Sequence, residues 1–546
     1  MKISFSRTNI IIFFLFNLII SQNFIYESED WFVLKNPGMV YSITEGPFNV
    51  FFGTENGIFK YDKFDNFIEY DFKLNQGLNN ESSVYYIHYD NYSDQIWVVT
   101  EQGIFYKNPL FNDYQEVRHH TINSYNLSSI AAFGSINQYI VIQYLSDYVI
   151  VDSFSGTVVE DEVNIDINNV SWSASSFGYN SSEIDLSTYY ADEWLIGFRQ
   201  ITDLYGNDES VIVSYEDRDL NLWFGTSNGK LLKGFKYSNK LDVKNIGPIS
   251  NNITSIASDT NQKWYFATDG QSYKKRRQFN YNKQSNSFLS VWNEYEDSWL
   301  YWNQSDFPEI SNPIINCIVN INEEYLALGT MEGVIISSLD NYKDFKYLNK
   351  RDGLNDNIII DMEYYNEKIF IMTYKGISIY SLLNDIVIEK NILIDYNLQN
   401  SGMLDMLLID DSLFFSSKAG LFQFNIKDRY LQKISNNAFS QIASYKNKIV
   451  GLNESLWIID YLDNKEKVVV FNTNNVRNFS LFDNYVWLNL VDKVRLINLD
   501  SKEKWTYNHN DGFDDIEVFD LGRDGNWVYF LTDQGVLYYN WREYHH

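Results

Sequence analysis

The sequence is poor in cysteine, histidine and proline, and these deficits exclude several kinds of protein. A single Cys rules out a disulfide framework and zinc sites built from cysteines. Six scattered His residues provide no ligand set for a transition metal, so we expect no cofactor, with weak calcium binding at acidic turns as the one open case. Only 6 of 546 residues are Pro, which leaves long stretches free to form strands.

Positive charge is also scarce. The chain has 43 Lys and Arg against 72 Asp and Glu, for a net charge of −29. A nucleic acid is therefore an unfavourable partner. Apolar residues make up 45% of the chain, which is enough for a packed core, and the 17% of aromatic residues favours β-strands over helices.

The first 21 residues have the pattern of an export signal. Lys2 and Arg7 form a positive region, and a mostly apolar run follows from Ile10 to Ile20. This run is too short to span a bilayer, and Ser21 supplies a small residue at its end. We therefore predict a signal peptide at 1–21 and an exported protein, in the periplasm, at the cell surface or outside the cell, with no membrane span.

A short phrase recurs along the chain: an apolar strand end, Thr or Ser, two residues, Gly, and a second apolar strand. Copies lie at 51–59, 97–105 and 223–231, and others centre on Thr330, Thr373, Ser417 and Thr532. The Gly adopts a positive φ that closes a β-hairpin. With a shortened copy at Thr268 included, four of the seven intervals between adjacent copies are 42 to 46 residues, which accommodates four strands. A four-stranded unit with this period is typical of a propeller blade, with a β-sandwich array or β-helix as the alternative.

The best copy of this phrase runs from Asp217 to Thr226 and reads DRDLNLWFGT, with Gly229 three residues later. It resembles the two-component regulator propeller repeat, although Leu220 stands where that family often has Gly. Gly-Leu pairs at 77–78 and 353–354 match the opening of that family's next blade, and the resemblance covers most of residues 37–540. It implies a propeller fold and a role similar to the sensing parts of hybrid histidine kinases or to type IX secretion accessory propellers. It implies no active site.

The number of copies predicts an all-β protein with two propeller rings of about six to seven four-stranded blades each. We place the first ring at 22–270, an insertion or linker at 271–312 and the second ring at 313–546; alternatively, the C-terminus closes the first ring. Residues 160–207 interrupt the period and are a candidate for a decayed blade. Trp31 and Trp541 are candidates for closing strands or for core aromatics.

Signatures of catalysis and of metal binding are weak. The sequence has no Gly-rich phosphate loop and no Gly-x-Ser-x-Gly elbow, so we predict no catalytic residues. His119 and His120 are adjacent, and adjacent residues on a strand point to opposite faces. Asp217, Asp219 and Asn221 have the alternate spacing of a calcium loop but lack its Gly and distal Glu, which favours an ordinary acidic turn.

The segment 271–312 has a composition unlike the rest of the chain. It combines the densest basic run with a series of aromatic residues, and positive charge beside exposed aromatics suits a protein or glycan partner. The alternative is a solvated basic loop next to a hairpin that packs into the core. The candidate binding residues are Lys274, Lys275, Arg276, Arg277, Trp292, Trp299 and Trp302.

These observations favour an exported, non-enzymatic propeller that binds, senses or scaffolds at the cell envelope, with a protein or glycan as partner. A carbohydrate-active propeller enzyme, a lyase or glycosidase, is the alternative function. A cluster of His, Tyr, Arg and acidic residues at one ring mouth would distinguish the enzyme from the binding module.

Overall fold

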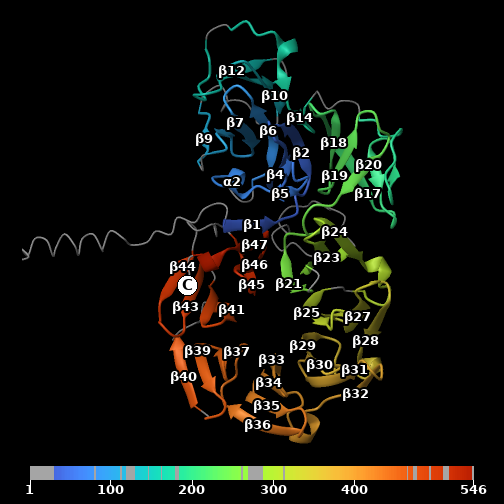
Figure 1. Ribbon diagram of the computed structural model, residues 1–546, viewed down its shortest axis with the longest axis vertical. Coiled ribbons are helices and arrows are strands. Elements are labelled where there is room, and N and C mark those ends of the chain that lie inside the picture. The colour runs from blue at the N-terminus through green and yellow to red at the C-terminus, as the bar shows by residue number, and fades with distance from the viewer. Residues whose placement is uncertain are drawn as a thin grey trace, which may run out of the picture.

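The computed structural model describes residues 30–78, 82–110, 113–118, 129–144, 147–160, 163–178, 184–259, 262–268, 287–311, 314–463, 465–470, 476–490, 493–507 and 516–543. Within these residues the strands form eleven antiparallel sheets, arranged as two sets (Figure 1). The all-β prediction is confirmed. The predicted signal peptide at 1–21 lies outside the described residues and stays a prediction.

Among the described residues, each helical segment is a single turn. No described helix has the length and apolar character that a membrane span requires. The helical segments are α2 (Phe72–Asn75), η3 (Ile167–Asn169), η5 (Gln304–Asp306), η6 (Lys350–Asp352), η7 (Ile394–Tyr396) and η9 (Trp541–Glu543).

Seven four-stranded sheets make up the C-terminal set. Six of them are meanders in which four consecutive strands pair in order. Their strands are β21 (Ile253–Ser258), β22 (Lys263–Thr268), β23 (Ser287–Asn293), β24 (Ser298–Asn303), β25 (Ile315–Ile321), β26 (Tyr325–Thr330), β27 (Val334–Ser338), β28 (Phe345–Leu348), β29 (Ile359–Tyr365), β30 (Lys368–Thr373), β31 (Gly376–Ser381), β32 (Ile386–Glu389), β33 (Met403–Ile409), β34 (Ser412–Ser417), β35 (Gly420–Asn425), β36 (Tyr430–Ser435), β37 (Gln441–Tyr445), β38 (Lys448–Leu452), β39 (Leu456–Asp460), β40 (Lys465–Val470), β41 (Val476–Phe482), β42 (Tyr485–Leu490), β43 (Lys493–Asn498) and β44 (Lys504–Tyr507).

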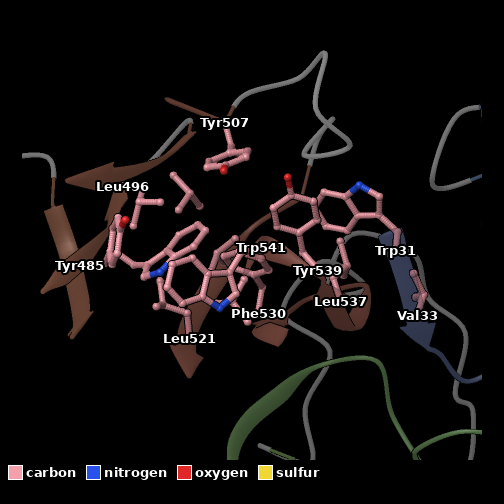
Figure 2. Packing of buried hydrophobic residues seen from close by; sticks show 14 residues of the cluster. Trp31, Val33, Tyr485, Leu496, Tyr507, Leu521, Phe530, Leu537, Tyr539 and Trp541 are labelled. Carbon is pink, nitrogen blue, oxygen red and sulfur yellow. The ribbon is translucent and has the colours of Figure 1, made fainter. Parts of the chain in front are cut away.

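The seventh sheet joins the two ends of the described chain. It takes its edge strand, β1 (Trp31–Leu34), from the start of the chain and its other strands from the end, with Trp31 opposite Tyr539. The two rings stack with their centroids 4.8 Å apart, and the same cluster contains Trp541 (Figure 2). Trp31 is therefore a core aromatic within a closing strand, whereas Trp541 lies in η9 and is a core aromatic only. The remaining strands are β45 (Val518–Asp524), β46 (Trp527–Thr532) and β47 (Gly535–Tyr539).

The first strands of these seven sheets follow one another in a closed circle. The strands β21, β25, β29, β33, β37, β41 and β45 each contact the next, and β45 contacts β21. Side chains bridge the main chains of neighbouring first strands. Asn316 Nδ2 donates to the Ile359 carbonyl at 2.7 Å, and Asp405 accepts from the Ile442 amide at 2.6 Å. These side chains satisfy backbone groups that no strand-to-strand hydrogen bond satisfies.

Four sheets make up the N-terminal set, in the orders β14-β2-β3-β4-β5, β6-β7-β8-β9, β12-β11-β10-β13 and β15-β16-β17-β18-β19-β20. Their strands are β2 (Val40–Glu45), β3 (Asn49–Thr54), β4 (Gly57–Asp62), β5 (Ile68–Tyr70), β6 (Val84–Asp90), β7 (Gln95–Thr100), β8 (Ile104–Lys107), β9 (Gln115–Glu116), β10 (Ile130–Ile136), β11 (Tyr139–Tyr144), β12 (Tyr148–Asp152), β13 (Ser171–Trp172), β14 (Ala174–Ser175), β15 (Leu195–Ile196), β16 (Gln200–Thr202), β17 (Asp208–Glu216), β18 (Asn221–Thr226), β19 (Leu231–Phe235) and β20 (Leu241–Lys244).

The irregular segment 160–207 explains why the N-terminal set is smaller than predicted. Its strands are two or three residues long, and each joins a sheet that longer strands already form: β13 pairs with β10, β14 with β2 and β16 with β17. A strand of this length cannot bury a face of its own. The described residues between 40 and 244 therefore form four sheets, whereas the spacing predicted six or seven blades for the first ring.

The recurring Thr-x-x-Gly phrase is a hairpin turn, as predicted. Thr330 Oγ1 donates to the Gly333 carbonyl at 2.8 Å, and Thr532 bonds Gly535 in the same way at 2.7 Å. Gly420, which follows Ser417 by three residues, has a φ of +128°, a conformation that an L side chain rarely adopts. The phrase thus encodes the hairpins β26–β27, β30–β31, β34–β35 and β46–β47 of the C-terminal set.

Two crossing segments, 35–39 and 245–252, connect the sets and lie side by side. The Asn36 amide donates to Asn251 Oδ1 at 2.6 Å, and Asn36 Nδ2 donates to the Pro248 carbonyl at 2.8 Å. A Cβ on Gly247 would lie 2.1 Å from the Lys35 carbonyl oxygen, so only Gly permits this approach. The chain returns to the C-terminal set before β21, earlier than the predicted boundary at 271–312.

Part of the predicted insertion or linker is regular sheet. Residues 287–303 form β23 and β24, which pair with β22 and with each other. The remainder of the β22–β23 connection, 269–286, lies outside the described residues. Because a long connection replaces the tight Gly turn at this point, the repeat phrase is missing and the two strands could not be assigned from it.

Candidate functional site

The three tryptophans of the predicted binding surface are buried. Trp292 on β23 is 5% exposed, and Trp299 and Trp302 on β24 are 9% and 2% exposed. A recognition surface would need these rings exposed, so their burial contradicts that hypothesis and fits the alternative, a hairpin that packs into the core. The basic run Lys274, Lys275, Arg276 and Arg277 lies outside the described residues, and its role stays a prediction.

Cross-strand packing accounts for this burial. Trp292 pairs directly with Trp299, and their rings stack with centroids 5.8 Å apart and planes 17° apart. Trp302 stacks on Phe307 at 5.7 Å. Alternate residues of a strand face opposite sides of the sheet, so these aromatics contribute to two separate core clusters rather than to one surface.

A cavity of about 740 Å³ lies between the two sets of sheets. We call it the inter-set cavity. The edge strand β1 lies beside it, in contact with β5 and α2 of the N-terminal set. Its lining comes from one wall of each set and from β1: Trp31, Phe32, Lys60, Phe67, Glu69, Tyr70, Asp71, Phe72, Lys73, Trp264, Trp292, Glu294, Asp524, Trp527 and Tyr538.

Nine of these fifteen lining residues are aromatic. On one side of β1, Trp31 stacks on Phe72 of α2 with centroids 5.8 Å apart, which packs the two sets together. On the other side, Phe32 stacks on Trp292 at 6.1 Å. Trp527 and Phe67 are only half-buried, so their rings are available to a ligand. A concave aromatic lining with a few polar groups is typical of a ligand site.

The N-terminal wall carries a compensated charge cluster. Lys60 Nζ lies 2.9 Å from Glu69 and 3.0 Å from Asp71. Burial by itself would lower the pKa of Lys60, but the two carboxylates outweigh this effect and raise it. Lys60 therefore stays charged and is already neutralised by its own wall.

The C-terminal wall carries two exposed carboxylates, Glu294 and Asp524. The Trp264 indole donates to Glu294 at 3.1 Å. Tyr538 lines the same wall, and its buried hydroxyl has no hydrogen-bond partner among the described residues. Burial raises the pKa of Tyr538, and Tyr529, Asp524 and Glu294 raise it further. This wall therefore presents negative charge next to aromatic rings.

Trp292 is the one predicted binding residue, among those described, that lines the inter-set cavity, and no sequence signal predicted the cavity itself. Its residues come from five stretches of chain, 31–32, 60–73, 264, 292–294 and 524–538, and each belongs to an ordinary strand, turn or short helix. The closing of the last sheet by β1 and the contacts of β21 with β45 and β46 bring these stretches together.

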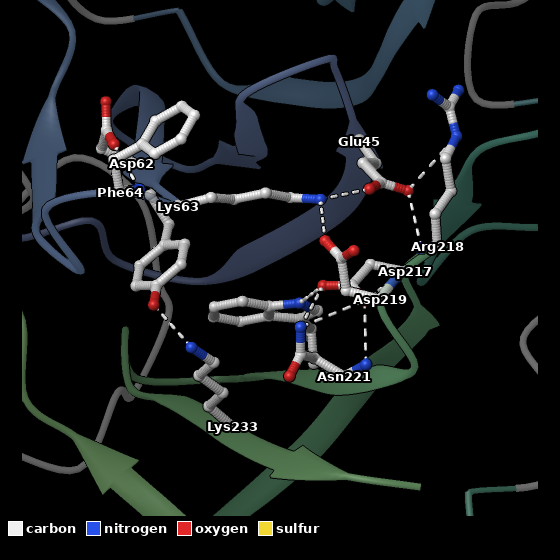
Figure 3. A network of polar contacts seen from close by, with 11 residues as sticks. Glu45, Asp62, Lys63, Phe64, Asp217, Arg218, Asp219, Asn221 and Lys233 are labelled. Carbon is white, nitrogen blue, oxygen red and sulfur yellow. Dashed lines mark hydrogen bonds and ion pairs between the residues drawn. The ribbon is translucent and has the colours of Figure 1, made fainter.

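The calcium-like turn at Asp217 is occupied by its own hydrogen bonds. The Asp217 carboxylate accepts from the Asp219 amide, from the Asn221 amide and side chain, and from the Trp223 indole (Figure 3). These donors are all N–H groups, which saturate the carboxylate and compete with a cation. The turn therefore does not fit a calcium site, and the ordinary acidic turn is the better interpretation.

The one histidine among the described residues, His88, is structural. Its ring nitrogens lie 2.8 Å from Ser173 Oγ and 2.9 Å from Ser135 Oγ in the core of the N-terminal set. Burial lowers the pKa of His88 to about 4, so the ring is neutral near pH 7. Within the described residues, no group of three or more His, Cys, Asp or Glu side chains could hold a metal ion.

A scan of family models and a search of curated proteins found no match. Among solved structures, PorZ, described as an essential surface component of the type-IX secretion system of Porphyromonas gingivalis, matches with a TM-score of 0.55 and 10% identity over 93% of this chain and 87% of PorZ. The chain shares its fold with PorZ. The similarity predicted from the repeat is confirmed at the level of fold.

Extracellular domains of two further proteins from B. thetaiotaomicron are also similar. The domain of BT4673, described as a one component system, matches with a TM-score of 0.43 and 13% identity over 91% of this chain and 69% of that chain. The domain of BT3049, described as a hybrid two component system, matches with a TM-score of 0.40 and 16% identity over 93% and 83%.

Proposed function

We propose that this protein is an exported, non-enzymatic binding module of the cell envelope, and that it binds its ligand in the inter-set cavity. The observation that carries this proposal is the cavity itself. It has a volume of about 740 Å³ and nine aromatic lining residues. Volumes of this order bury most of a small ligand or a short segment of a larger one.

We also propose that the C-terminal set is one seven-bladed propeller and that the N-terminal set is a smaller unit packed against it. Support comes from the closed circle of contacts among the seven first strands and from the closing strand β1. The cavity then lies at the joint between two rigid units, a common place for a ligand site.

The proposed location rests on the export pattern of residues 1–21 and on the shared fold with PorZ, a bacterial surface component. We expect mature protein to begin near Gln22 and to fractionate with the envelope or the medium. Intact Met1 on protein in the cytosol would contradict this location.

Ligand binding at the cavity is tested by intrinsic tryptophan fluorescence, because four Trp residues line it. Basic, acidic and neutral oligopeptides and oligosaccharides serve as probes. Trp527→Ala should abolish the response to any probe that binds, since Trp527 is half-buried in the wall. Tyr430→Ala is the control, because Tyr430 is 63% exposed and is not among the lining residues. A response that survives Trp527→Ala would place the binding site elsewhere.

A further inference from the structure

The two walls of the inter-set cavity differ in charge. On the N-terminal wall, Lys60 is neutralised by Glu69 and Asp71. On the C-terminal wall, neither Glu294 nor Asp524 forms an ion pair with a described residue. Four carboxylates and two lysines line the cavity in total, so its net charge is negative. An anionic ligand would be repelled.

The aromatic groups strengthen this preference for a cation. The carboxylates of Glu294 and Asp524 lie on the same wall as Trp264, Trp527 and Tyr538. Aromatic faces attract ammonium and guanidinium groups, and the attraction grows when water is excluded. Tyr538 is 6% exposed, and its hydroxyl has no hydrogen-bond partner among the described residues. The negative charges of Asp524 and Glu294 contribute to its raised pKa.

We propose that the inter-set cavity takes a peptide segment through a basic side chain, whose guanidinium or ammonium group binds between Glu294 and Asp524. This inference rests on the proposed function and specifies its ligand. The cavity, at about 740 Å³, is larger than a single amine group would fill. Its aromatic lining extends to Phe67 and Phe72 on the opposite wall. A basic side chain would bind the two carboxylates, and the neighbouring residues of the peptide would contact the rings.

The net charge of the whole chain also favours a basic ligand. A net charge of −29 attracts basic segments from a distance, and this attraction weakens with salt. Association with a basic peptide should therefore be faster at low ionic strength, whereas binding of a neutral ligand would not change.

The test compares three probes by isothermal titration calorimetry on the mature protein: an acetylated pentapeptide of alternating Gly and Arg, the same peptide with Glu in place of Arg, and a neutral glucose hexasaccharide. We expect the Arg peptide to bind and the Glu peptide not to bind. The variant Glu294→Gln with Asp524→Asn should raise the Kd for the Arg peptide about tenfold or more, since each charge-assisted contact contributes over 1 kcal/mol.

The matched control replaces two exposed carboxylates that do not line the cavity, Asp340→Asn with Glu454→Gln. It removes the same net charge and should leave the Kd within about twofold. Both double variants should keep the melting temperature of the parent, because their targets are exposed.

Three results would overturn the inference: no binding of the Arg peptide, equal or tighter binding of the Glu peptide or the hexasaccharide, or a Kd that Glu294→Gln with Asp524→Asn leaves unchanged. Binding of the hexasaccharide that Trp527→Ala abolishes would reject the cationic ligand while preserving the cavity as the binding site. The two proposals therefore fail separately.

Discussion

The two sets of sheets were built from the same phrase but differ in regularity. In the C-terminal set, turns such as Thr330–Gly333 and Thr532–Gly535 recur with one geometry, and every sheet has four strands. In the N-terminal set, short strands extend two sheets to five and six strands. The difference shows that a repeat phrase specifies a sheet only while all four of its strands are long enough to pair.

Two kinds of polar contact join neighbouring sheets in both sets. First strands of the C-terminal set are bridged by polar side chains, for example from Asp405 to the Ile442 amide. Ion pairs also join neighbouring sheets, as between Arg429 and Glu389 of the C-terminal set. In the N-terminal set, Lys63 bonds Glu45 of its own sheet and lies 2.8 Å from Asp219 of another (Figure 3). Buried bridges and exposed ion pairs should respond in opposite ways to pH.

The largest expected effect tests the closing strand. Trp31→Ala removes a residue that is 5% exposed and stacks on Tyr539, so it should destabilise the C-terminal set by about 3–5 kcal/mol. Trp223→Ala, at 0% exposure, should cost a similar amount in the N-terminal set. Calorimetry should show each variant lowering a different transition. Equal shifts of both transitions by both variants would mean that the sets unfold as one unit.

The next effect tests the turn glycines. Gly420→Ala should cost about 2–4 kcal/mol, because φ is +128° and the new Cβ would meet the Ser435 carbonyl oxygen at 2.3 Å. Gly206→Ala is the matched change in the N-terminal set: φ is +81°, but no atom lies within 4 Å, so about 1 kcal/mol of backbone strain is expected. Urea unfolding measures both. Equal costs would show that backbone conformation alone, and not the close approach, makes Gly420 necessary.

A smaller effect is expected in the pH dependence of stability at Asp520, a carboxylate of the first strand β45. Burial raises the pKa of Asp520 to about 6. The stability that protonated Asp520 contributes is therefore complete below about pH 4 and is lost as the pH rises through 6. Asp520→Asn cannot ionise and should stabilise the C-terminal set by about 1–2 kcal/mol at pH 8, with little effect at pH 4. Thermal melts at the two pH values provide the measurement. A destabilised variant at pH 8 would show that the charged form is favoured in the fold.

The smallest effect is expected for the exposed ion pair of Asp219 with Lys63 in the N-terminal set. A hydrogen bond from Lys63 lowers the pKa of Asp219, so its contribution is present above the ordinary Asp pKa and is lost as the pH falls. Asp219→Asn should slightly lower the melting temperature at pH 7 and leave it unchanged near pH 2, opposite in sign to Asp520→Asn. Asp219 is exposed, so a large loss at pH 7 would contradict the weak, solvent-screened pair that we infer.

Local features of the fold could be predicted from the sequence, whereas the candidate site could not. The Thr-x-x-Gly turns, the all-β class and the acidic turn at Asp217 follow from residues within about ten positions of one another. At Trp292, Trp299 and Trp302 the sequence left an exposed surface and a core-packing hairpin both open, because a run of aromatics beside a basic segment is compatible with either. The structure shows the packed hairpin.

The sequence by itself determined the hairpins, since a Gly with positive φ and flanking β-formers need no distant partner. Tertiary structure decided three further features: that β1 pairs with β47, that strands in 160–207 join existing sheets, and that Glu294 and Asp524 lie opposite Lys60 across one cavity. Each of these depends on contacts between residues far apart in the chain. Such contacts depend on which edges and faces remain unpaired after the local hairpins have formed, and no local pattern encodes that.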